Sequence, residues 1–148
     1  MDNKDYTNII LEIFQEICKI PHPSGQEEAI GDYLMAFAKA HGLKAKKDNV
    51  GNILICKAAA KGCEKSPTVI LQAHQDMVCE KDAALIHDFM KQPIQTYIED
   101  GWLKAKGTTL GADDGIGMAM MLAVLADSTL KHGPIEALFT VSEETGLT

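Results

Sequence analysis

An apolar run rich in β-branched residues, Thr68 to Leu71, is the feature that most constrains how this chain can fold. Such a run predicts a buried strand, here the central strand of a sheet. The run leads into His74 and Asp76, two positions apart. Because strand side chains alternate, both would point to the same side, with Cα atoms roughly 6.6 Å apart in extended backbone. Open α/β sheets place their binding sites at the carboxyl ends of such strands, so this segment also predicts where a site lies.

The part of the chain before this strand has the apolar periodicity of two amphipathic helices. They are predicted over residues 6–19 and 24–41. The second begins with a capping-box pattern, in which Ser24 would be the N-cap and Glu27 would reach back to it. Gly42 would follow as the residue that ends this helix.

Further strands are predicted from apolar alternation between turn residues, as two hairpins and one separate buried strand. Their ranges are residues 43–47, 52–57, 94–98, 102–105 and 135–141. A glycine-rich loop over residues 107–117 opens a third helix that runs to about Asp127. Helices that flank mixed strands indicate a layered α/β domain.

Composition excludes several classes of function. A chain of 148 residues suits one domain with a real core. Its net charge of −7 and pI near 5.1 argue against a nucleic-acid partner or an anionic membrane surface. No segment has the roughly 20 apolar residues that a membrane span needs, and the polar amino terminus has no secretory signal. The four cysteines lack Cys-x-x-Cys spacing, which favours reduced thiols and a cytoplasmic location.

Two neighbouring aspartates, Asp113 and Asp114, lie where the third helix is predicted to begin. One of them is expected to cap the free N–H groups and complement the helix dipole. The surrounding loop holds more glycine than capping requires, and glycine lets a ligand approach the backbone closely. A phosphate-binding loop is a weak alternative, because Gly-Lys-Ser/Thr is lacking and the aspartates would repel phosphate.

A second acidic pair, Glu143 and Glu144, follows an otherwise apolar predicted strand. A polar stop at a sheet edge would explain the pair equally well. Adjacent strand residues point in opposite directions, so both can serve one site only if the backbone turns there. Thr145 and Gly146 supply such a turn. The pair could then provide one metal ligand and one general base.

Taken together, one histidine and carboxylates at three element ends predict a divalent-metal site. Imidazole and carboxylate ligands suit Zn²⁺, Mn²⁺ or Co²⁺ and need no thiolate. A carboxylate can bridge two ions roughly 3.5–4 Å apart, as in two-metal hydrolases. Ions held in this way would acidify a bound water and polarise a carbonyl group.

Four segments of the chain resemble the aminoacyl-histidine dipeptidases, also called Xaa-His dipeptidases. This family is part of a larger group of co-catalytic zinc peptidases that includes aminoacylase-type enzymes. The matching segments occur in the family's order, at residues 20–25, 73–78, 107–117 and 142–146. The resemblance extends over essentially the whole chain and implies a layered α/β/α catalytic domain with a mixed sheet.

The resemblance also implies roles for individual residues. His74 would bind one zinc ion, Asp113 would bridge two, and Glu144 would bind the other. Asp76 would be the carboxylate that orients His74, and Glu143 would be the general base. The implied reaction is hydrolysis of Xaa-His dipeptides with a free α-amino group, by a water that two zinc ions activate.

Members of the family continue with another metal-binding aspartate, a distal metal-binding histidine and a lid domain. Residues 1–148 are therefore expected to be the amino-terminal part of a catalytic domain that is incomplete at its carboxyl end, and inactive when isolated. The expected partners are a small peptide and, through the lid domain, a second copy of the chain. The remaining histidines are expected to have surface or capping roles, at positions 22, 41, 87 and 132.

Two other interpretations stay open at this point. The chain could be a non-catalytic remnant that binds metal weakly, which would share the fold and lack the activity. It could also belong to a related amidohydrolase of the aminoacylase type, with the same metal chemistry and an acylated amino acid as substrate. A panel of substrates would separate the second interpretation from a dipeptidase.

Overall fold

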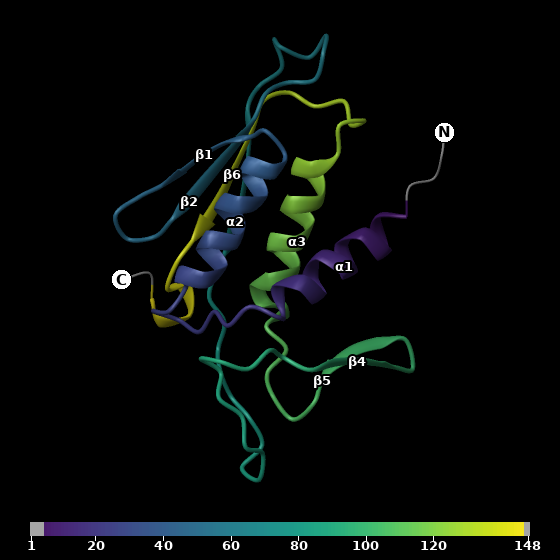
Figure 1. The fold of residues 1–148 in the computed structure, drawn as a ribbon. Helices are drawn as coiled ribbons and strands as arrows, with labels where there is room; N and C mark the ends of the chain where they lie inside the picture. The colour runs from purple at the N-terminus through teal and green to yellow at the C-terminus, as the bar shows by residue number, and fades with distance from the viewer. Residues whose placement is uncertain (1–4, 147–148) are drawn as a thin grey trace.

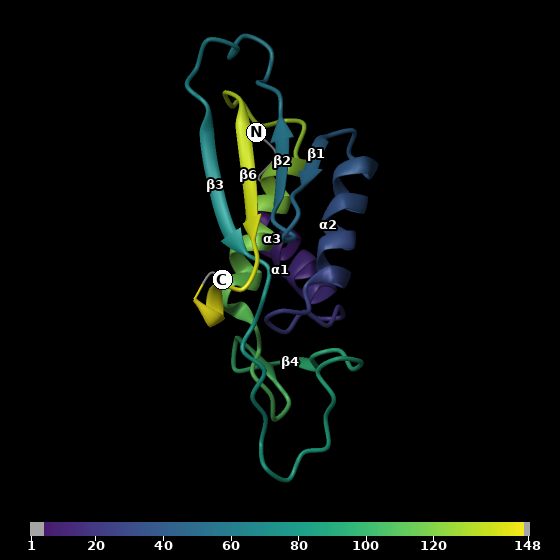
Figure 2. The same ribbon diagram turned by 90° about the vertical axis from the view of Figure 1, so that its left-hand side faces the viewer.

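A four-stranded sheet and three helices on one of its faces organise the chain (Figures 1 and 2). The structure is a computed structural model, and it describes residues 5–146. The elements follow in the order α1 (Tyr6–Ile17), α2 (Glu28–Ala40), β1 (Lys44–Lys47), β2 (Ile53–Lys57), β3 (Val69–His74), β4 (Thr96–Glu99), β5 (Trp102–Ala105), α3 (Ala112–Ala126), β6 (Ile135–Thr140) and a short 3₁₀ turn, η1 (Glu143–Thr145).

The sheet is mixed, as predicted. Its strand order is β1-β2-β6-β3, with antiparallel pairs β1–β2 and β2–β6 and the parallel pair β3–β6. The register of the parallel pair puts His74 opposite Thr140. Because parallel strands end at the same edge of a sheet, the segments after β3 and β6 leave side by side. This pairing brings the residues around His74 next to the turn η1.

The helices form one layer against the sheet. Helix α2 packs on β1 and β2, α3 packs on β3, and α1 packs on α3. Alternate residues of β2 and β6 face this layer and are fully buried, namely Ile53, Ile55, Ala137 and Phe139. The α/β class is thus confirmed, while the second helical layer of the expected α/β/α arrangement is not formed by residues 5–146 (Figure 2). None of the helices in this described part has the length and apolar character that crossing a membrane requires.

Strand β3 forms where it was predicted, but at a different place in the sheet. It pairs only with β6 among the described strands, so it is an edge strand there rather than the central one. Val69 and Ile70 are 50% and 66% exposed. Apolar, β-branched composition favours a strand, whereas burial depends on which other elements cover it, and composition does not contain that information.

The predicted capping box at the start of α2 is wrong. The helix begins at Glu28, and its N-cap residue Glu27 makes no side-chain capping bond. The side chains of Ser24 and Glu27 instead bind segments far along the chain, at Asp76 and Ser142. The far end of α2 is as predicted: Gly42 adopts the left-handed conformation, with φ of +66°, that lets the chain leave a helix.

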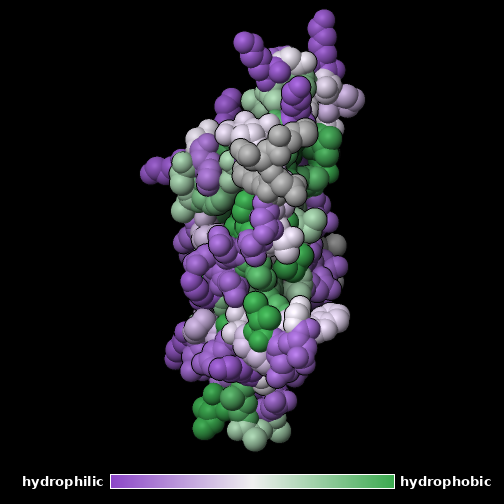
Figure 3. All heavy atoms as spheres, turned by 90° about the vertical axis from the view of Figure 1, so that its right-hand side faces the viewer, coloured by the Kyte–Doolittle hydropathy of each residue, from purple (hydrophilic) through white to green (hydrophobic). Residues whose placement is uncertain are grey.

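An apolar groove of about 370 Å³ lies between α1, α3 and the β4–β5 hairpin. Its lining includes Ile10, Leu11, Ile98, Leu103 and Met120. Figure 3 shows this side of the molecule, with apolar side chains along the middle of a mostly polar face. The groove lies outside the predicted site.

Candidate metal centre

His74 is the last residue of β3, and its side chain is almost completely buried. Its ring atom Nδ1 lies 2.9 Å from the backbone carbonyl oxygen of Asp76. A carbonyl oxygen only accepts hydrogen bonds, so Nδ1 carries a proton and donates it. This contact directs the other ring nitrogen, Nε2, towards Asp113, whose Oδ1 is 3.0 Å away. His74 therefore presents Nε2 as its ligand atom.

The two aspartates at the start of α3 have different surroundings. Their backbone is not helical, with φ and ψ of −90° and 108° at Asp113 and −110° and 32° at Asp114. The side chain of Asp113 is 87% exposed and faces His74. Asp114 instead accepts a hydrogen bond of 3.2 Å from the N–H of Gly117 in the first turn. One of the pair thus caps the helix, as predicted, and the other is left for the site.

Glu143 and Glu144 lie in the turn η1, which bends the chain directly after β6. The predicted turn is confirmed, although it starts earlier, at Ser142, whose φ and ψ are 56° and 33°. Oε2 of Glu143 comes within 4.0 Å of His74 Nε2. The ligand atom of Glu144 lies within 4.8 Å of those of His74 and Asp113, so both glutamates can serve the same site.

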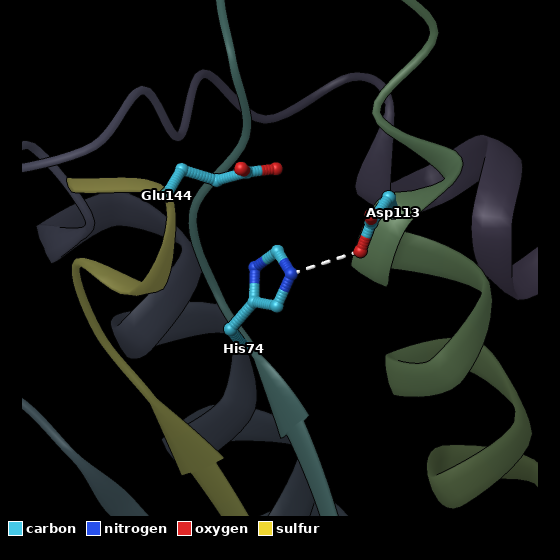
Figure 4. Close-up of side chains that lie close together, drawn as sticks. All are labelled: His74, Asp113 and Glu144. Carbon is cyan, nitrogen blue, oxygen red and sulfur yellow. Dashed lines mark hydrogen bonds and ion pairs between the residues drawn. The ribbon is translucent and has the colours of Figure 1, made fainter. Parts of the chain in front are cut away.

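His74, Asp113 and Glu144 come together from three distant segments (Figure 4). Each offers one ligand atom, and these atoms all lie within 4.8 Å of one another. One imidazole nitrogen and two carboxylate oxygens are the donors that Zn²⁺, Mn²⁺ and Co²⁺ accept, so the residues fit a divalent ion. The structure thus brings together the three predicted ligands, and their assignment as ligands stays a prediction.

Asp76 connects the two strand ends that form the site. It is 1% exposed, and its carboxylate accepts three hydrogen bonds. Oδ1 accepts from the backbone N–H of Glu143 at 3.0 Å, and Oδ2 accepts from Glu144 N–H at 3.2 Å and Ser24 Oγ at 2.7 Å. The carboxylate is 3.5 Å from His74 Nδ1, farther than the carbonyl oxygen of the same residue. Asp76 therefore contacts His74 mainly through its backbone, while its side chain holds η1.

The pKa values of the two buried groups shift in opposite directions. Burial by itself raises the pKa of Asp76, but the hydrogen bonds from Ser24 and from the backbone of η1 outweigh it and lower that pKa. Burial by itself lowers the pKa of His74, but the hydrogen bond with Asp113 and the nearby carbonyl and carboxylates outweigh it and raise that pKa. Both shifts favour the charged forms, the carboxylate of Asp76 and, in metal-free protein, protonated His74, whose proton on Nε2 would compete with a metal ion.

Sequence reasoning missed the residues that support the site through hydrogen bonds without being proposed ligands. Ser24 and Glu27 carry a sequence signal, but its pattern is that of a capping box. Gln75 lies in sequence between His74 and Asp76, just after β3, and is fully buried; its Nε2 donates to the carbonyl oxygens of Gly51 and Phe139 at 3.1 and 2.9 Å. A glutamine that continues an apolar strand is a weak signal of such a role.

The prediction of a surface or capping role for His22 is wrong. This side chain is 3% exposed, and its Nδ1 lies 2.6 Å from the carbonyl oxygen of Ile20. Burial lowers the pKa of His22 and so favours the neutral form of the ring. The two prolines beside it predicted only an interrupted helix, because burial here depends on the segment after β3, around Met77, lying alongside.

Comparison with known proteins identifies the family. Residues 70–147 match the model of Peptidase family M20/M25/M40. The chain is 54% identical to the Cytosol non-specific dipeptidase of Escherichia coli (strain K12) over 136 residues, which cover 92% of this chain and 28% of that protein. It is 32% identical to the Uncharacterized protein YqjE of Bacillus subtilis (strain 168) over 93% of this chain and 37% of that protein.

Solved structures agree with this result. The aminoacylhistidine dipeptidase from Vibrio alginolyticus superposes with a TM-score of 0.92 and 47% identity, covering 99% of this chain and 31% of that one. A tripeptidase from Staphylococcus aureus gives a TM-score of 0.76 and 27% identity, covering 94% and 37%. The chain thus spans about three-tenths of the length of the most similar of these relatives. The resemblance to the dipeptidases is confirmed, and the chain belongs to peptidase family M20/M25/M40.

Proposed function

We propose that this chain contributes the core of a two-metal site in a dipeptidase that hydrolyses Xaa-His-type dipeptides. The observation that carries the proposal is the convergence of His74, Asp113 and Glu144, with Glu143 beside them. The similarity to relatives named as a non-specific dipeptidase and an aminoacylhistidine dipeptidase supports the same substrate class. Because the chain covers about three-tenths of those relatives, the activity belongs to the whole protein.

The chain's own residues would hold the metal ions. His74 would bind one ion through Nε2, Asp113 would bridge both, and Glu144 would bind the second. Zinc is the proposed metal, with Mn²⁺ or Co²⁺ as substitutes, since all three accept this donor set. When bound, the ions acidify a water molecule and polarise the scissile carbonyl group.

Glu143 would be the general base. Its backbone N–H is held by Asp76, while its side chain is 46% exposed and so can reach a substrate. Its carboxylate would accept a proton from the attacking water and then deliver it to the nitrogen of the leaving amino acid as the peptide bond breaks. Asp76 would keep His74 and the acidic turn η1 in fixed positions relative to each other through its hydrogen bonds.

The remaining proposals concern the whole protein. Residues 1–148 would be the amino-terminal part of the catalytic domain, and later segments would supply another aspartate and a distal histidine as ligands. A lid domain would cover the substrate and join two copies of the chain. The relative named for the cytosol supports a cytoplasmic location.

The test uses the whole natural protein. Its metal is first removed with a chelator, and Zn²⁺, Mn²⁺ or Co²⁺ is then added back by titration. We expect it to hydrolyse dipeptides with a carboxyl-terminal histidine only after metal is restored. Unchanged hydrolysis by metal-free protein would overturn the proposal. Faster release of acids from N-acyl amino acids than of histidine from dipeptides would favour an aminoacylase-type amidohydrolase. The chain of 148 residues is expected to be inactive by itself, and turnover by it would refute that point.

A further inference from the structure

The loop before α2 contacts the inner side of the proposed site. We define it as the anchor loop, residues 23–27. Its backbone runs beside the segment after β3, where Pro23 forms an isolated parallel bridge with Met77. Met77 N–H donates to the carbonyl oxygen of His22 at 3.2 Å. The anchor loop is therefore held against the segment that directly follows β3.

The first side-chain contact runs from Ser24 to Asp76. The Ser24 hydroxyl donates a hydrogen bond of 2.7 Å to Oδ2 of Asp76. The same oxygen accepts from the backbone N–H of Glu144 at 3.2 Å. Ser24 thus limits where the Asp76 carboxylate can point, and that carboxylate in turn fixes the backbone of both glutamates.

The second side-chain contact runs from Glu27 to Ser142. Oε1 of Glu27 accepts from Ser142 N–H at 3.0 Å and lies 3.3 Å from its hydroxyl. Ser142 is not a glycine, yet its φ of +56° is in the left-handed region that side chains rarely adopt. A hydrogen bond between a backbone N–H and a carboxylate is a strong one, and it holds the residue where the chain bends into η1.

Neither side chain serves its own helix. Residues with capping-box identities make no side-chain capping bond at the start of α2, and both reach across the fold. Oε1 of Glu27 also accepts a hydrogen bond of 3.0 Å from the N–H of Gly25 inside the anchor loop. Together they hold the turn from two sides: Glu27 holds Ser142 just before it, and Ser24 acts through Asp76 on Glu143 and Glu144.

From these contacts we infer that Ser24 and Glu27 are positioning residues of the metal site. They set the direction of the Glu143 and Glu144 side chains without touching metal or substrate. This inference rests on the proposed function, because it gives the two glutamates their roles. It adds that the amino-terminal loop, far from the ligands in sequence, controls how tightly the site binds metal.

The experiment compares two pairs of variants in the natural full chain. Ser24→Ala removes the hydroxyl, and Ser24→Thr keeps it. Glu27→Ala removes the acceptor, and Glu27→Gln keeps an amide oxygen in its place. Gln26→Ala is the matched control, since Gln26 lies in the same loop, is exposed and has no side-chain hydrogen bond with the described residues. Zn²⁺ affinity is measured by competition with a chromophoric chelator, and kcat and KM are measured with an Xaa-His dipeptide.

Loss of a partner that orients a ligand typically costs about 10- to 100-fold in metal affinity or activity. We therefore expect the two alanine variants to lose metal affinity and kcat to this extent, with little change in KM. Ser24→Thr and Glu27→Gln should recover most of the loss, and Gln26→Ala should equal wild type. Thermal unfolding of the metal-free variants identifies any that fail to fold, and the conservative pair then still provides the comparison.

Two results separate the inference from the proposed function. If both alanine variants bind Zn²⁺ and turn over as Gln26→Ala does, the positioning role is wrong while the dipeptidase remains. If wild type binds Zn²⁺ but hydrolyses no dipeptide, the proposed function fails. The zinc affinities of the variants would still decide whether the anchor loop positions the site.

Discussion

Asp76 Oδ1 accepts a hydrogen bond of 3.0 Å from the backbone N–H of Glu143, so a side chain at the end of β3 fixes the backbone of the turn after β6. The two residues are 67 positions apart in the chain. The contact exists because β3 and β6 are parallel neighbours that end at the same edge of the sheet. Together with the contact between His74 Nδ1 and the Asp76 carbonyl oxygen, it joins the proposed base and the proposed histidine ligand in one hydrogen-bonded unit.

Replacing Asp76 with asparagine tests this unit. The carboxamide has one accepting oxygen where the carboxylate has two, so at least one of its three part-buried hydrogen bonds is lost. We expect the free energy of unfolding to fall by about 1–3 kcal/mol. We also expect Zn²⁺ affinity to fall roughly 10- to 100-fold. Denaturant unfolding and chelator competition measure the two effects.

Asp48→Asn is the matched control for that variant. Asp48 also accepts through both oxygens, but in the β1–β2 turn. Oδ1 accepts the backbone N–H groups of Val50, Gly51 and Asn52, and Oδ2 accepts from Asn52 Nδ2 at 2.8 Å, the bond that an asparagine would lose. We expect it to lower stability and leave zinc affinity unchanged. If Asp48→Asn weakened zinc binding as much as Asp76→Asn, the effect would be general loosening of the fold rather than loss of the unit.

Substitution of the two glutamates of η1 should have different effects, because the two residues have different proposed roles. Glu143→Gln removes the proposed base and should lower kcat by roughly 10²- to 10⁴-fold, with metal content unchanged. Glu144→Gln weakens a proposed ligand and should lower zinc affinity instead. Metal analysis of the purified variants together with kcat distinguishes the two. The reverse pattern would exchange the two assignments, and a normal rate in Glu143→Gln would end the base assignment.

The raised pKa of His74 predicts opposite pH dependences for stability and metal binding. A group whose pKa is higher in the folded state stabilises the fold below its unfolded value, here 6.5, and loses that effect as pH rises through the folded pKa. Metal-free protein should therefore become less stable over that range. Zinc affinity should rise over the same range, because the proton leaves Nε2.

Thermal unfolding and zinc titration between about pH 5 and 9 check this, since the interval brackets an ordinary histidine pKa. His74→Gln should remove this group's contribution from both profiles, because glutamine does not titrate. Profiles of the same steepness in wild type and variant would show that another group is responsible. The lowered pKa of Asp76 affects stability in a separate pH range. The ionised carboxylate stabilises the fold above about pH 4, and this contribution is lost as the pH falls below that value.

The contact between α1 and α3 gives a prediction about the core. A Cβ atom added at Gly115 would lie 2.7 Å from Cε2 of Phe14, which is fully buried. Gly115→Ala should therefore lower the free energy of unfolding by about 1–3 kcal/mol through overpacking. Chemical denaturation measures the loss.

A second substitution provides the control for Gly115→Ala. Phe14→Leu removes the ring atoms that the new methyl group would meet, so the double variant should lose less than the sum of the two single losses. Strictly additive losses would show that Phe14 is not the side chain that prevents a larger residue at position 115.

Local patterns predicted most elements of this fold, because helices and hairpins depend on interactions between near neighbours. The apolar stripes of α1 and α2, and the left-handed Gly42 after α2, formed as expected. The capping box failed for a physical reason: residues 24–27 have the right identities, but Asp76 and Ser142 offer their side chains better-fixed partners than a free helix end does.

The sequence by itself determined which groups stand at the ends of elements: His74 after an apolar run, Asp113 at a glycine-rich helix start, and two glutamates after the last strand. Only the tertiary structure decided that they meet, since the parallel pairing of β3 with β6 and the packing of α3 on β3 close the distance. It also decided that the carboxylate of Asp76 holds η1 while its carbonyl oxygen holds His74. Hydrogen bonds between segments some 40 to 70 residues apart depend on the register of the whole sheet, which no local pattern of residues contains.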